Sequence, residues 1–264
     1  SLTTDITQIA EWQPGDIVIF NIEASCGSFI GNGRNDNQGH FYFNTKRLPE
    51  QNTGLKSPIK YSGSTSDIIL FAVFDGLGGG LNGQEASCTA CEVFANEYKM
   101  LDEIALSGKE FMINACKKAN EVINNISSEK QINTMGTTVA ALHISQDEVV
   151  ACNMGDSKIF RIRNNQMIQI SEDHTDEKIM LSMGIKKKPV LLQYLGIPET
   201  EMAIEPFIAK GDVQDEDVYI ICSDGVTDVV SVEDLYEYIK EKTPDDAVKT
   251  ILAEVNKKDG SDNA

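Results

Sequence analysis

Short stretches rich in apolar and β-branched residues recur along much of the chain and predict many strands. We expect strands at residues 16–23, 68–74, 137–144, 148–153, 158–163, 166–170, 203–208 and 218–222. Several links between them are very short, such as 145–147 and 164–165. Because parallel neighbours need a much longer crossover, these short links predict antiparallel meanders.

Apolar residues at helical spacing predict helices before and after these strands. Two helical stretches follow the glycine-rich segment 76–83, and one face of the second carries Met112, Ala115, Cys116, Ala119, Val122, Ile123 and Ile126. Near the end of the chain, Ser231 and Asp234 have the spacing of a capping box, and Pro244 suits a first helical position. The pattern predicts an α+β fold: two antiparallel β-sheets packed as a central sandwich flanked by helices on both sides, in αββα layers.

The chain of 264 residues is long enough for a sizeable core, and we expect a single domain over 1–264. Residues 44–66 are polar, rich in Gly, Ser, Pro and Asn, and show no hydrophobic period. This composition predicts a long surface insertion within that domain.

Charge and cysteine usage narrow the function classes. The net charge of −18 argues against binding to nucleic acid or to an anionic membrane, since both require a basic surface. No apolar run approaches the ~20 residues of a membrane span. The six cysteines lie mostly in apolar segments, which is typical of buried, reduced thiols. We expect a cytoplasmic protein that acts as a monomer.

Four aspartates follow apolar strand-like runs and stand beside Gly or a small polar residue: Asp75, Asp156, Asp224 and Asp262. Carboxylates presented in glycine-opened turns suit hard cations such as Mg²⁺ or Mn²⁺, which prefer oxygen ligands. A single Asp-Gly pair is also a common turn, so one such motif would carry little weight. Four of them in one chain favour a metal site.

These motifs, in their order, resemble those of the metal-dependent Ser/Thr protein phosphatases, the PPM family or type 2C, in its bacterial form. The matching segments are Ser28 to Gln38, Asp75-Gly-Leu-Gly-Gly79, Met135-Gly-Thr-Thr138, Met154-Gly-Asp-Ser157, Ser223-Asp-Gly-Val-Thr-Asp228 and Gly260-Ser-Asp-Asn263. The resemblance covers nearly the whole chain. It implies that residues 173–200 form the flap subdomain beside the active site.

The resemblance also implies a metal centre of two Mn²⁺ or Mg²⁺ ions, with a third, weaker position. Asp75 would bridge two ions and the carbonyl of Gly76 would bind one of them. Asp224 and Asp262 would hold the other ion, and Asp156 would contribute to the third position. Two ions at such a centre can activate a water for in-line attack on a phosphoryl group.

The first motif supplies the remaining site residues. Gln38 would belong to the metal site, and Arg34 would grip the substrate phosphate with its planar fork, which a lysine could not do. Arg34 and Asp75 are therefore the expected catalytic residues. The implied substrates are phosphoserine and phosphothreonine in proteins, modified by an opposing Ser/Thr kinase.

The chain departs from the family pattern at two positions. Gly39 stands where the motif carries an Asp that steadies a metal-bound water, and Asp36 or His40 are nearby substitutes. Leu77 replaces a His found in many eukaryotic members. These departures motivate an alternative, a weak or catalytically silent phosphatase-fold module that binds phosphopeptides or a partner. A third hypothesis is a hydrolase of small phosphoesters.

Overall fold

The computed structural model describes residues 18–32, 34–101, 106–146, 148–258 and 260–264. Among these residues the larger sheet has seven strands, six of them in the order β11-β8-β7-β5-β2-β3, with β6 paired to β5. All of its pairs are antiparallel. Its strands are β2 (Gly39–Phe43), β3 (Lys46–Arg47), β5 (Ile69–Leu77), β6 (Gly136–Thr137), β7 (Val139–Ser145), β8 (Glu148–Met154) and β11 (Phe207–Asp212).

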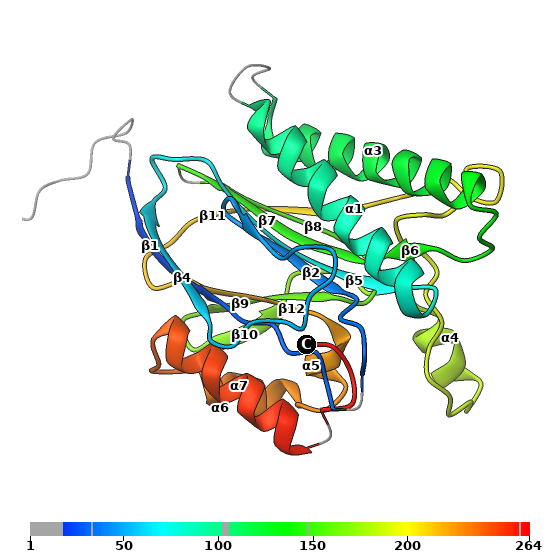
Figure 1. Ribbon diagram of the computed structural model, residues 1–264. Helices are drawn as coiled ribbons and strands as arrows, with labels where there is room; N and C mark the ends of the chain where they lie inside the picture. Colours follow the sequence, from blue (N-terminus) through cyan, green and yellow to red (C-terminus); the bar gives the residue numbers. More distant parts are fainter. Residues whose placement is uncertain (1–17, 33, 102–105, 147, 259) are drawn as a thin grey trace, which may run out of the picture.

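A second β layer packs against this sheet (Figure 1). It consists of two small antiparallel sheets, in which β1 (Asn21–Cys26) pairs with β4 (Ile59–Ser64), and β9 (Lys158–Arg163) lies between β10 (Gln166–Gln169) and β12 (Val218–Cys222). Buried side chains of the large sheet, such as Leu142 and Ala151, meet Ile159 of β9 and Ile221 of β12 between the layers. The second layer is therefore divided between two sheets.

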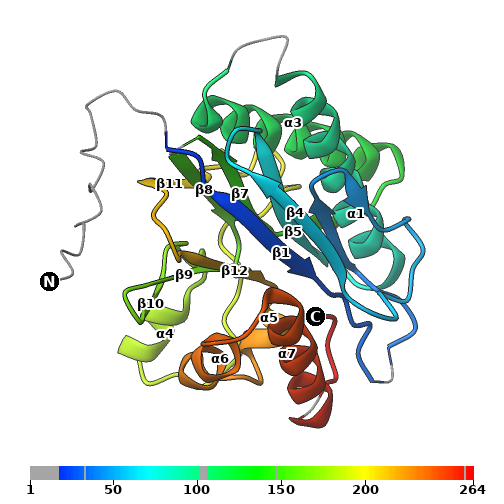
Figure 2. The ribbon, with the colours of Figure 1, turned by 90° about the vertical axis from the view of Figure 1, so that its left-hand side faces the viewer.

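Helices cover both outer faces of the sandwich, as Figures 1 and 2 show. On the large sheet lie α1 (Gly80–Lys99) and α3 (Gly108–Glu129), whose apolar faces join one core with β5, β7 and β8. On the other side, α5 (Asp224–Thr227), α6 (Val232–Ile239) and α7 (Pro244–Lys258) share a core with β9 and β12. The predicted α+β fold with antiparallel sheets between helices is confirmed.

The helix signals in the sequence are also confirmed. Of the predicted face of α3, Met112, Ala115, Cys116, Ala119 and Ile123 are buried and Val122 and Ile126 are half-buried. The helix starts with a complete capping box between Ser107 and Glu110. The Ser231 side chain accepts the backbone N–H of Asp234 at 3.1 Å, so it caps α6 as expected. Pro244 is the first residue of α7.

The strand predictions fail mainly in the region before β5. Strand β2 was not predicted, although four of its five residues are buried. The segment 44–66 is not a patternless insertion, because it contains β3 and β4, and β4 pairs along its whole length with β1. Alternate residues of β4 are half-buried, as in a strand with one face on the core. Because Lys60, Ser62 and Gly63 are not apolar, the sequence shows no clear alternation of apolar and polar residues. Residues 16–17 of the first predicted strand lie outside the described residues, and the strand predicted at 203–208 begins at Phe207.

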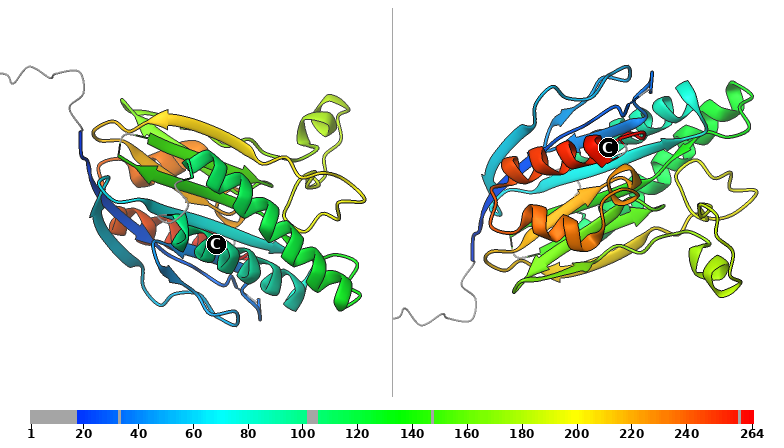
Figure 3. Two further views of the ribbon diagram at one scale, coloured as in Figure 1. Left: turned by 90° about the horizontal axis from the view of Figure 1, so that it is seen from above. Right: turned by 90° about the horizontal axis from the view of Figure 1, so that it is seen from below.

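One part of the chain projects beyond the layers. Between β10 and β11 the chain forms α4 (Glu177–Ser182) and an extended return segment, and Figure 3 shows α4 beyond one end of the sandwich. In the described ranges, none of the helices combines the length and the apolar character needed to cross a lipid bilayer.

Candidate metal centre

Asp75 lies near the end of β5, where hydrogen bonds from two other motifs fix its backbone. Its N–H donates to Thr138 Oγ1 at 3.1 Å, and its carbonyl accepts the N–H of Thr138 at 2.8 Å. The Thr138 hydroxyl also lies 2.7 Å from that of Ser157. These bonds place the carboxylate of Asp75 between the loops that follow β6 and β8.

The carboxylate of Asp75 faces other acidic groups. Burial raises its pKa well above the usual value, and the charges of Asp224, Asp262 and Asp156 raise it further. Asp75 also shares a side-chain hydrogen bond with Asp224. Four aspartates from distant parts of the chain therefore lie close enough for the other three charges to act on Asp75.

Asp156 lies in the turn after β8, which Gly155 opens with a φ of +99° that favours glycine. Burial raises the pKa of Asp156 to about 6, with a further contribution from Asp224. His174 holds this turn through two hydrogen bonds. Its ring Nδ1 accepts the backbone N–H of Gly155 at 3.2 Å, and its backbone N–H donates to the Gly155 carbonyl at 3.0 Å. The histidine thus organises the loop that presents Asp156.

Asp224 begins α5 directly after β12, and its carboxylate is paired with a lysine. Lys188 Nζ lies 3.1 Å from Asp224 Oδ2 and 3.2 Å from Asp228 Oδ2. Partial burial lowers the pKa of Lys188, but the two carboxylates outweigh this and raise it above its usual value. The lysine comes from the segment that follows α4, so the projecting part of the chain reaches the aspartate cluster.

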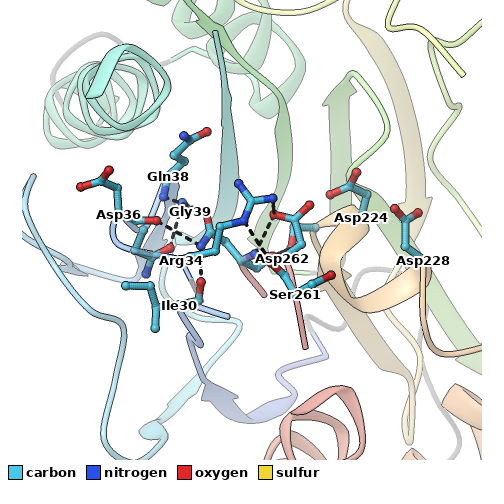
Figure 4. Close-up of polar contacts among 12 residues, drawn as sticks. Ile30, Arg34, Asp36, Gln38, Gly39, Asp224, Asp228, Ser261 and Asp262 are labelled. Atoms are coloured by element: carbon cyan, nitrogen blue, oxygen red, sulfur yellow. Dashed lines mark hydrogen bonds and ion pairs between the residues drawn. The ribbon is translucent and has the colours of Figure 1, made fainter. Parts of the chain in front are cut away.

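Asp262 comes after α7 and not after a strand, so the expectation that all four aspartates follow strands is wrong for this one; it stands beside Arg34. Arg34 donates from Nη2 to Asp262 Oδ1 at 2.8 Å and from Nε to the carbonyl of Ser261 at 3.0 Å. In Figure 4 the carboxylate of Asp262 lies between the Arg34 guanidinium and Asp224. The expected phosphate-binding arginine is therefore at the edge of the carboxylate cluster.

Asn263 joins this final segment to the first motif. Its Oδ1 accepts the N–H of Gln38 at 2.9 Å, and its Nδ2 donates to the carbonyls of Ile30 and Asp36. Because Asn263 is buried, these bonds set the position of Asp262 relative to Arg34.

Gly76 and Gln38 meet through their backbones, where the Gly76 N–H donates to the Gln38 carbonyl at 3.1 Å. A Cβ on Gly76 would lie 2.1 Å from the Gly83 carbonyl oxygen, so the approach of α1 requires glycine here. The Gln38 side chain donates to the Gly80 carbonyl at 3.1 Å. Its amide is therefore directed to the first turn of α1.

Gly39 lies opposite Asp75 in the β2–β5 pair, at the point where the motif normally supplies a carboxylate. The neighbouring groups do not replace it. His40 is buried with Nδ1 2.8 Å from Ser87 Oγ and Nε2 3.2 Å from the Pro49 carbonyl. The Asp36 side chain points away from Asp224 and Asp262 in Figure 4.

The residues at the cluster fit hard divalent cations. Carboxylate oxygens are suitable ligands, and burial, together with neighbouring carboxylates, raises the pKa of Asp75 and of Asp156, a cost that a cation would relieve. Within the described ranges, no three His, Cys, Asp or Glu side chains are drawn together closely enough to enclose one ion. Lys188 and Arg34 supply the counter-charges in this arrangement.

Sequence reasoning missed the contact of Lys188 with Asp224 and the hydroxyl pair of Thr138 and Ser157. Lys188 belongs to a run of three consecutive lysines, 186–188, and its distance in sequence from Asp224 gives no sign of the contact. The two hydroxyl residues were inside the quoted motifs, where their side-chain bonds could not be read.

Comparison with known proteins identifies the family. Residues 59–244 match the family model described as Protein phosphatase 2C. The serine/threonine phosphatase stp of Listeria innocua is 30% identical over 205 residues, which cover 72% of this chain and 80% of the relative. The serine/threonine protein phosphatase PstP of Mycobacterium tuberculosis is 25% identical over 183 residues, covering 65% of this chain and 34% of that longer protein.

Solved structures agree on the fold. The Mycobacterium tuberculosis phosphatase PstP/Ppp superposes with a TM-score of 0.71 at 21% identity, covering 93% of this chain and 96% of that one. The catalytic domain of PstP in complex with two manganese ions gives a TM-score of 0.70 at 20% identity, again covering 93% and 96%. The motif order, the converging aspartates and the match of the family model lead to one conclusion: this chain belongs to the protein phosphatase 2C family.

Proposed function

We propose that this chain hydrolyses phosphoserine and phosphothreonine esters of proteins with the help of Mn²⁺ or Mg²⁺. The observation that carries the proposal is the convergence of Asp75, Asp156, Asp224 and Asp262, with Arg34 beside Asp262. Membership of a family whose matched relatives are Ser/Thr phosphatases supports the reaction. The two manganese ions bound by PstP support the cofactor.

The resemblance to the family implies a role for each acidic residue. Asp75, on which the charges of the other three carboxylates act, would be the shared ligand of the ions, with the Gly76 carbonyl as a further ligand. Asp224 and Asp262 would complete one ion's ligand set and Asp156 would serve a third position. Bound ions supply a water of lowered pKa and polarise the phosphoryl oxygens. Gln38 would act through its backbone beside Gly76.

Arg34 is placed to bind the phosphate. Its guanidinium is partly exposed, and one carboxylate and one carbonyl hold it at the edge of the cluster. A phosphate dianion can replace these partners with two parallel hydrogen bonds from the planar fork. Arg34 would then orient the ester for attack from the aspartate side.

The test is Mn²⁺-dependent hydrolysis of an aryl phosphate and of a phosphothreonine peptide. We expect both activities in the wild type and a loss of at least a hundredfold in Asp75→Asn and in Asp224→Asn. Arg34→Lys should retain metal binding but raise KM, because a lysine cannot make the bidentate contact. Absence of hydrolysis in a folded, manganese-loaded wild type would refute the proposal and return us to a silent binding module.

The cellular setting is part of the proposal. We infer a monomeric cytoplasmic enzyme that opposes a Ser/Thr kinase. The free cysteines of the described chain, four of them buried, support a reducing compartment. The net charge of −18 supports protein substrates over nucleic acid or an anionic membrane. Residues 173–200 would act as the flap of this single domain, since they carry both His174 and Lys188 to the aspartates.

A further inference from the structure

The backbone of Gln38 is held by hydrogen bonds from three other parts of the chain. Its N–H donates to Asn263 Oδ1 at 2.9 Å, and its carbonyl accepts the N–H of Gly76 at 3.1 Å. The same carbonyl accepts the hydroxyl of Ser87 at 2.5 Å. Asn263 and Ser87 are both buried. Gln38 thus joins the last motif, the end of β5 and helix α1.

Close packing of α1 on the end of β5 brings Ser87 to this position. A Cβ on Gly83 would lie 3.0 Å from the carbonyl carbon of Gly76 and 2.7 Å from the side-chain oxygen of Gln38. Gly83 therefore lets the start of α1 lie directly against the strand end. Ser87 is four residues further along α1, so it lies on the same face of the helix. Its hydroxyl is directed at the Gln38 carbonyl and not at solvent.

The ring of His40 contacts the oxygen of this serine, and the hydrogen-bond partners decide which atom donates. His40 Nδ1 lies 2.8 Å from Ser87 Oγ. The other described groups that bond this oxygen are the carbonyls of Gln38, at 2.5 Å, and of Gln84, at 3.1 Å. A carbonyl cannot donate, so the serine gives its one proton to a carbonyl, the closer being that of Gln38. The serine oxygen then accepts from the ring, and Nδ1 of His40 carries a proton.

The ring is held on its other side as well. Its Nε2 lies 3.2 Å from the carbonyl of Pro49 and 3.4 Å from the amide nitrogen of Asn52. His40 is 2% exposed, so bulk water does not compete for these contacts. The ring therefore keeps one orientation, with Nδ1 directed at Ser87.

We propose that His40 and Ser87 are positioning residues of the metal centre. The hydrogen bonds that run from His40 through Ser87 fix the Gln38 carbonyl, and this carbonyl fixes the peptide group between Asp75 and Gly76. That peptide joins the expected shared carboxylate to the expected carbonyl ligand, so its rotation would displace both. Neither His40 nor Ser87 would touch an ion. The inference rests on the proposed function, because that proposal makes Asp75 and Gly76 metal ligands.

Calorimetric titration with Mn²⁺ tests the role of Ser87 without relying on turnover. Ser87→Ala removes the hydroxyl donor from the Gln38 carbonyl. Its matched control is Cys91→Ala, one turn later on α1, because Cys91 is buried and its thiol contacts the carbonyl of Phe41 on β2 at 3.3 Å. We expect the Kd for Mn²⁺ to rise about tenfold in Ser87→Ala and to stay within about twofold of wild type in Cys91→Ala.

Two substitutions of His40 separate hydrogen bonding from packing. The amide nitrogen of asparagine can take the place of Nδ1 and donate to Ser87, whereas the amide of glutamine reaches the place of Nε2. His40→Asn should therefore keep the Kd for Mn²⁺ near the wild-type value, and His40→Gln should raise it about as much as Ser87→Ala does. A role in packing alone predicts the reverse order, because glutamine fills the buried site better than asparagine.

The protonation of the ring gives a second readout. Nitrogen NMR of the isotope-labelled, metal-free protein should show a proton on His40 Nδ1, with a signal that shifts in Ser87→Ala. A ring protonated at Nε2 alone would reverse the assigned direction of donation and overturn the proposal.

The Kd values decide between the remaining outcomes. An equal rise in Ser87→Ala and Cys91→Ala, or wild-type Kd values in both Ser87→Ala and His40→Gln, would overturn the positioning role. A wild type that binds Mn²⁺ but does not hydrolyse aryl phosphate would refute the proposed reaction, while the Kd values would still test the positioning of the metal ligands. A wild type that binds no Mn²⁺ would refute both proposals.

Discussion

The ammonium group of Lys188 lies 3.1 Å from a carboxylate oxygen of Asp224, so the flap contributes a cation to the aspartate cluster. The same ammonium contacts Asp228, which follows one turn later. A divalent cation at Asp224 would meet this lysine at close range. Metal binding at Asp224 would therefore compete with the ion pair that holds the segment of Lys188.

Lys188→Ala should strengthen divalent cation binding. The lysine competes for Asp224 and repels an incoming ion, while its own side chain is 65% exposed, so solvent screens the ion pair to about 0.2–1 kcal/mol. We expect the Kd for Mn²⁺, measured by titration calorimetry, to fall about two- to fivefold. Lys187→Ala is the matched control, since the described chain gives it no ion pair. Equal Kd values in both variants would show that Lys188 does not compete with the metal.

Gly39→Asp tests whether the missing carboxylate limits the metal site. A Cβ at Gly39 would lie 3.2 Å from Asn37 Oδ1 and 3.9 Å from the Asn263 Cβ, so a small shift admits the side chain. Because position 39 is opposite Asp75, the added charge should lower the Mn²⁺ concentration for half-maximal activity about tenfold. Gly39→Asn has the same shape without the charge and should not do so. If both variants change the Mn²⁺ concentration for half-maximal activity equally, the cause is the shape of the new side chain and not its charge.

Removing the metal should destabilise the wild type through carboxylate repulsion. Saturation at about a hundred times the Kd adds ~2.7 kcal/mol to the free energy of unfolding. Asp75→Asn removes one of the repelling charges, so the variant without metal should melt ~2–4 °C above the metal-free wild type at pH 7.5. Adding Mn²⁺ should raise the melting temperature of the wild type alone. If the metal-free variant instead melts below the metal-free wild type, repulsion of the Asp75 carboxylate by its neighbours does not destabilise the wild type.

Thr138→Val should loosen the support of Asp75. The substitution leaves the Asp75 N–H and the Ser157 hydroxyl without their partner in a buried region, at a cost of about 1–3 kcal/mol. Urea unfolding with and without Mn²⁺ measures this loss. Thr138→Ser keeps the hydroxyl and should lose less than half as much. Equal losses in the two variants would point to methyl packing as the source of stability.

His143 should make the protein acid-sensitive. It is buried on β7 beside Phe111, and both ring nitrogens lack a hydrogen-bond partner among the described residues. Burial lowers its pKa, although Glu148 partly opposes this, so the folded protein holds the neutral ring. The stability that depends on the neutral ring is present above the unfolded pKa of ~6.5 and is lost as the pH falls through the folded pKa.

Denaturant unfolding of wild type and His143→Leu from pH 8 to pH 5 tests this sign. The difference in the free energy of unfolding should be constant above pH 7. Below pH 6.5 the wild type should lose stability relative to the variant by up to ~1.4 kcal/mol per pH unit, until the pH reaches the pKa of His143 in the folded protein. A difference independent of pH would mean that the ring is already protonated or has the same pKa in both states.

The parts of the fold that the sequence predicted are those with strong local signals. The N-cap at Ser231 and the Pro244 start of α7 each depend on only a few neighbouring residues of the chain, so their patterns could be read directly. Strand β4 depends on pairing with β1, and its own residues, among them Lys60 and Gly63, give a weak β signal. Its stability comes from tertiary context, which propensity does not report.

At the site, too, local motifs could be predicted from the sequence and long-range contacts could not. Asp75 and Asp224 could be predicted because each stands in a recognisable motif at the end of a strand. The contact of Lys188 with Asp224 could not, because it depends on how the flap returns to the body of the protein. The direction of the His40 side chain likewise follows from its contact with Ser87, which adjacency to the motif did not reveal.

The most direct test of the account is a crystal structure with Mn²⁺, read from anomalous diffraction at the manganese edge. We predict at least two manganese peaks within ligand distance of Asp75 and its partners Asp224 and Asp262, with Lys188 displaced from Asp224. The absence of manganese at Asp75 in crystals of a protein that is fully active with Mn²⁺ would contradict the claim that these aspartates form the catalytic metal centre.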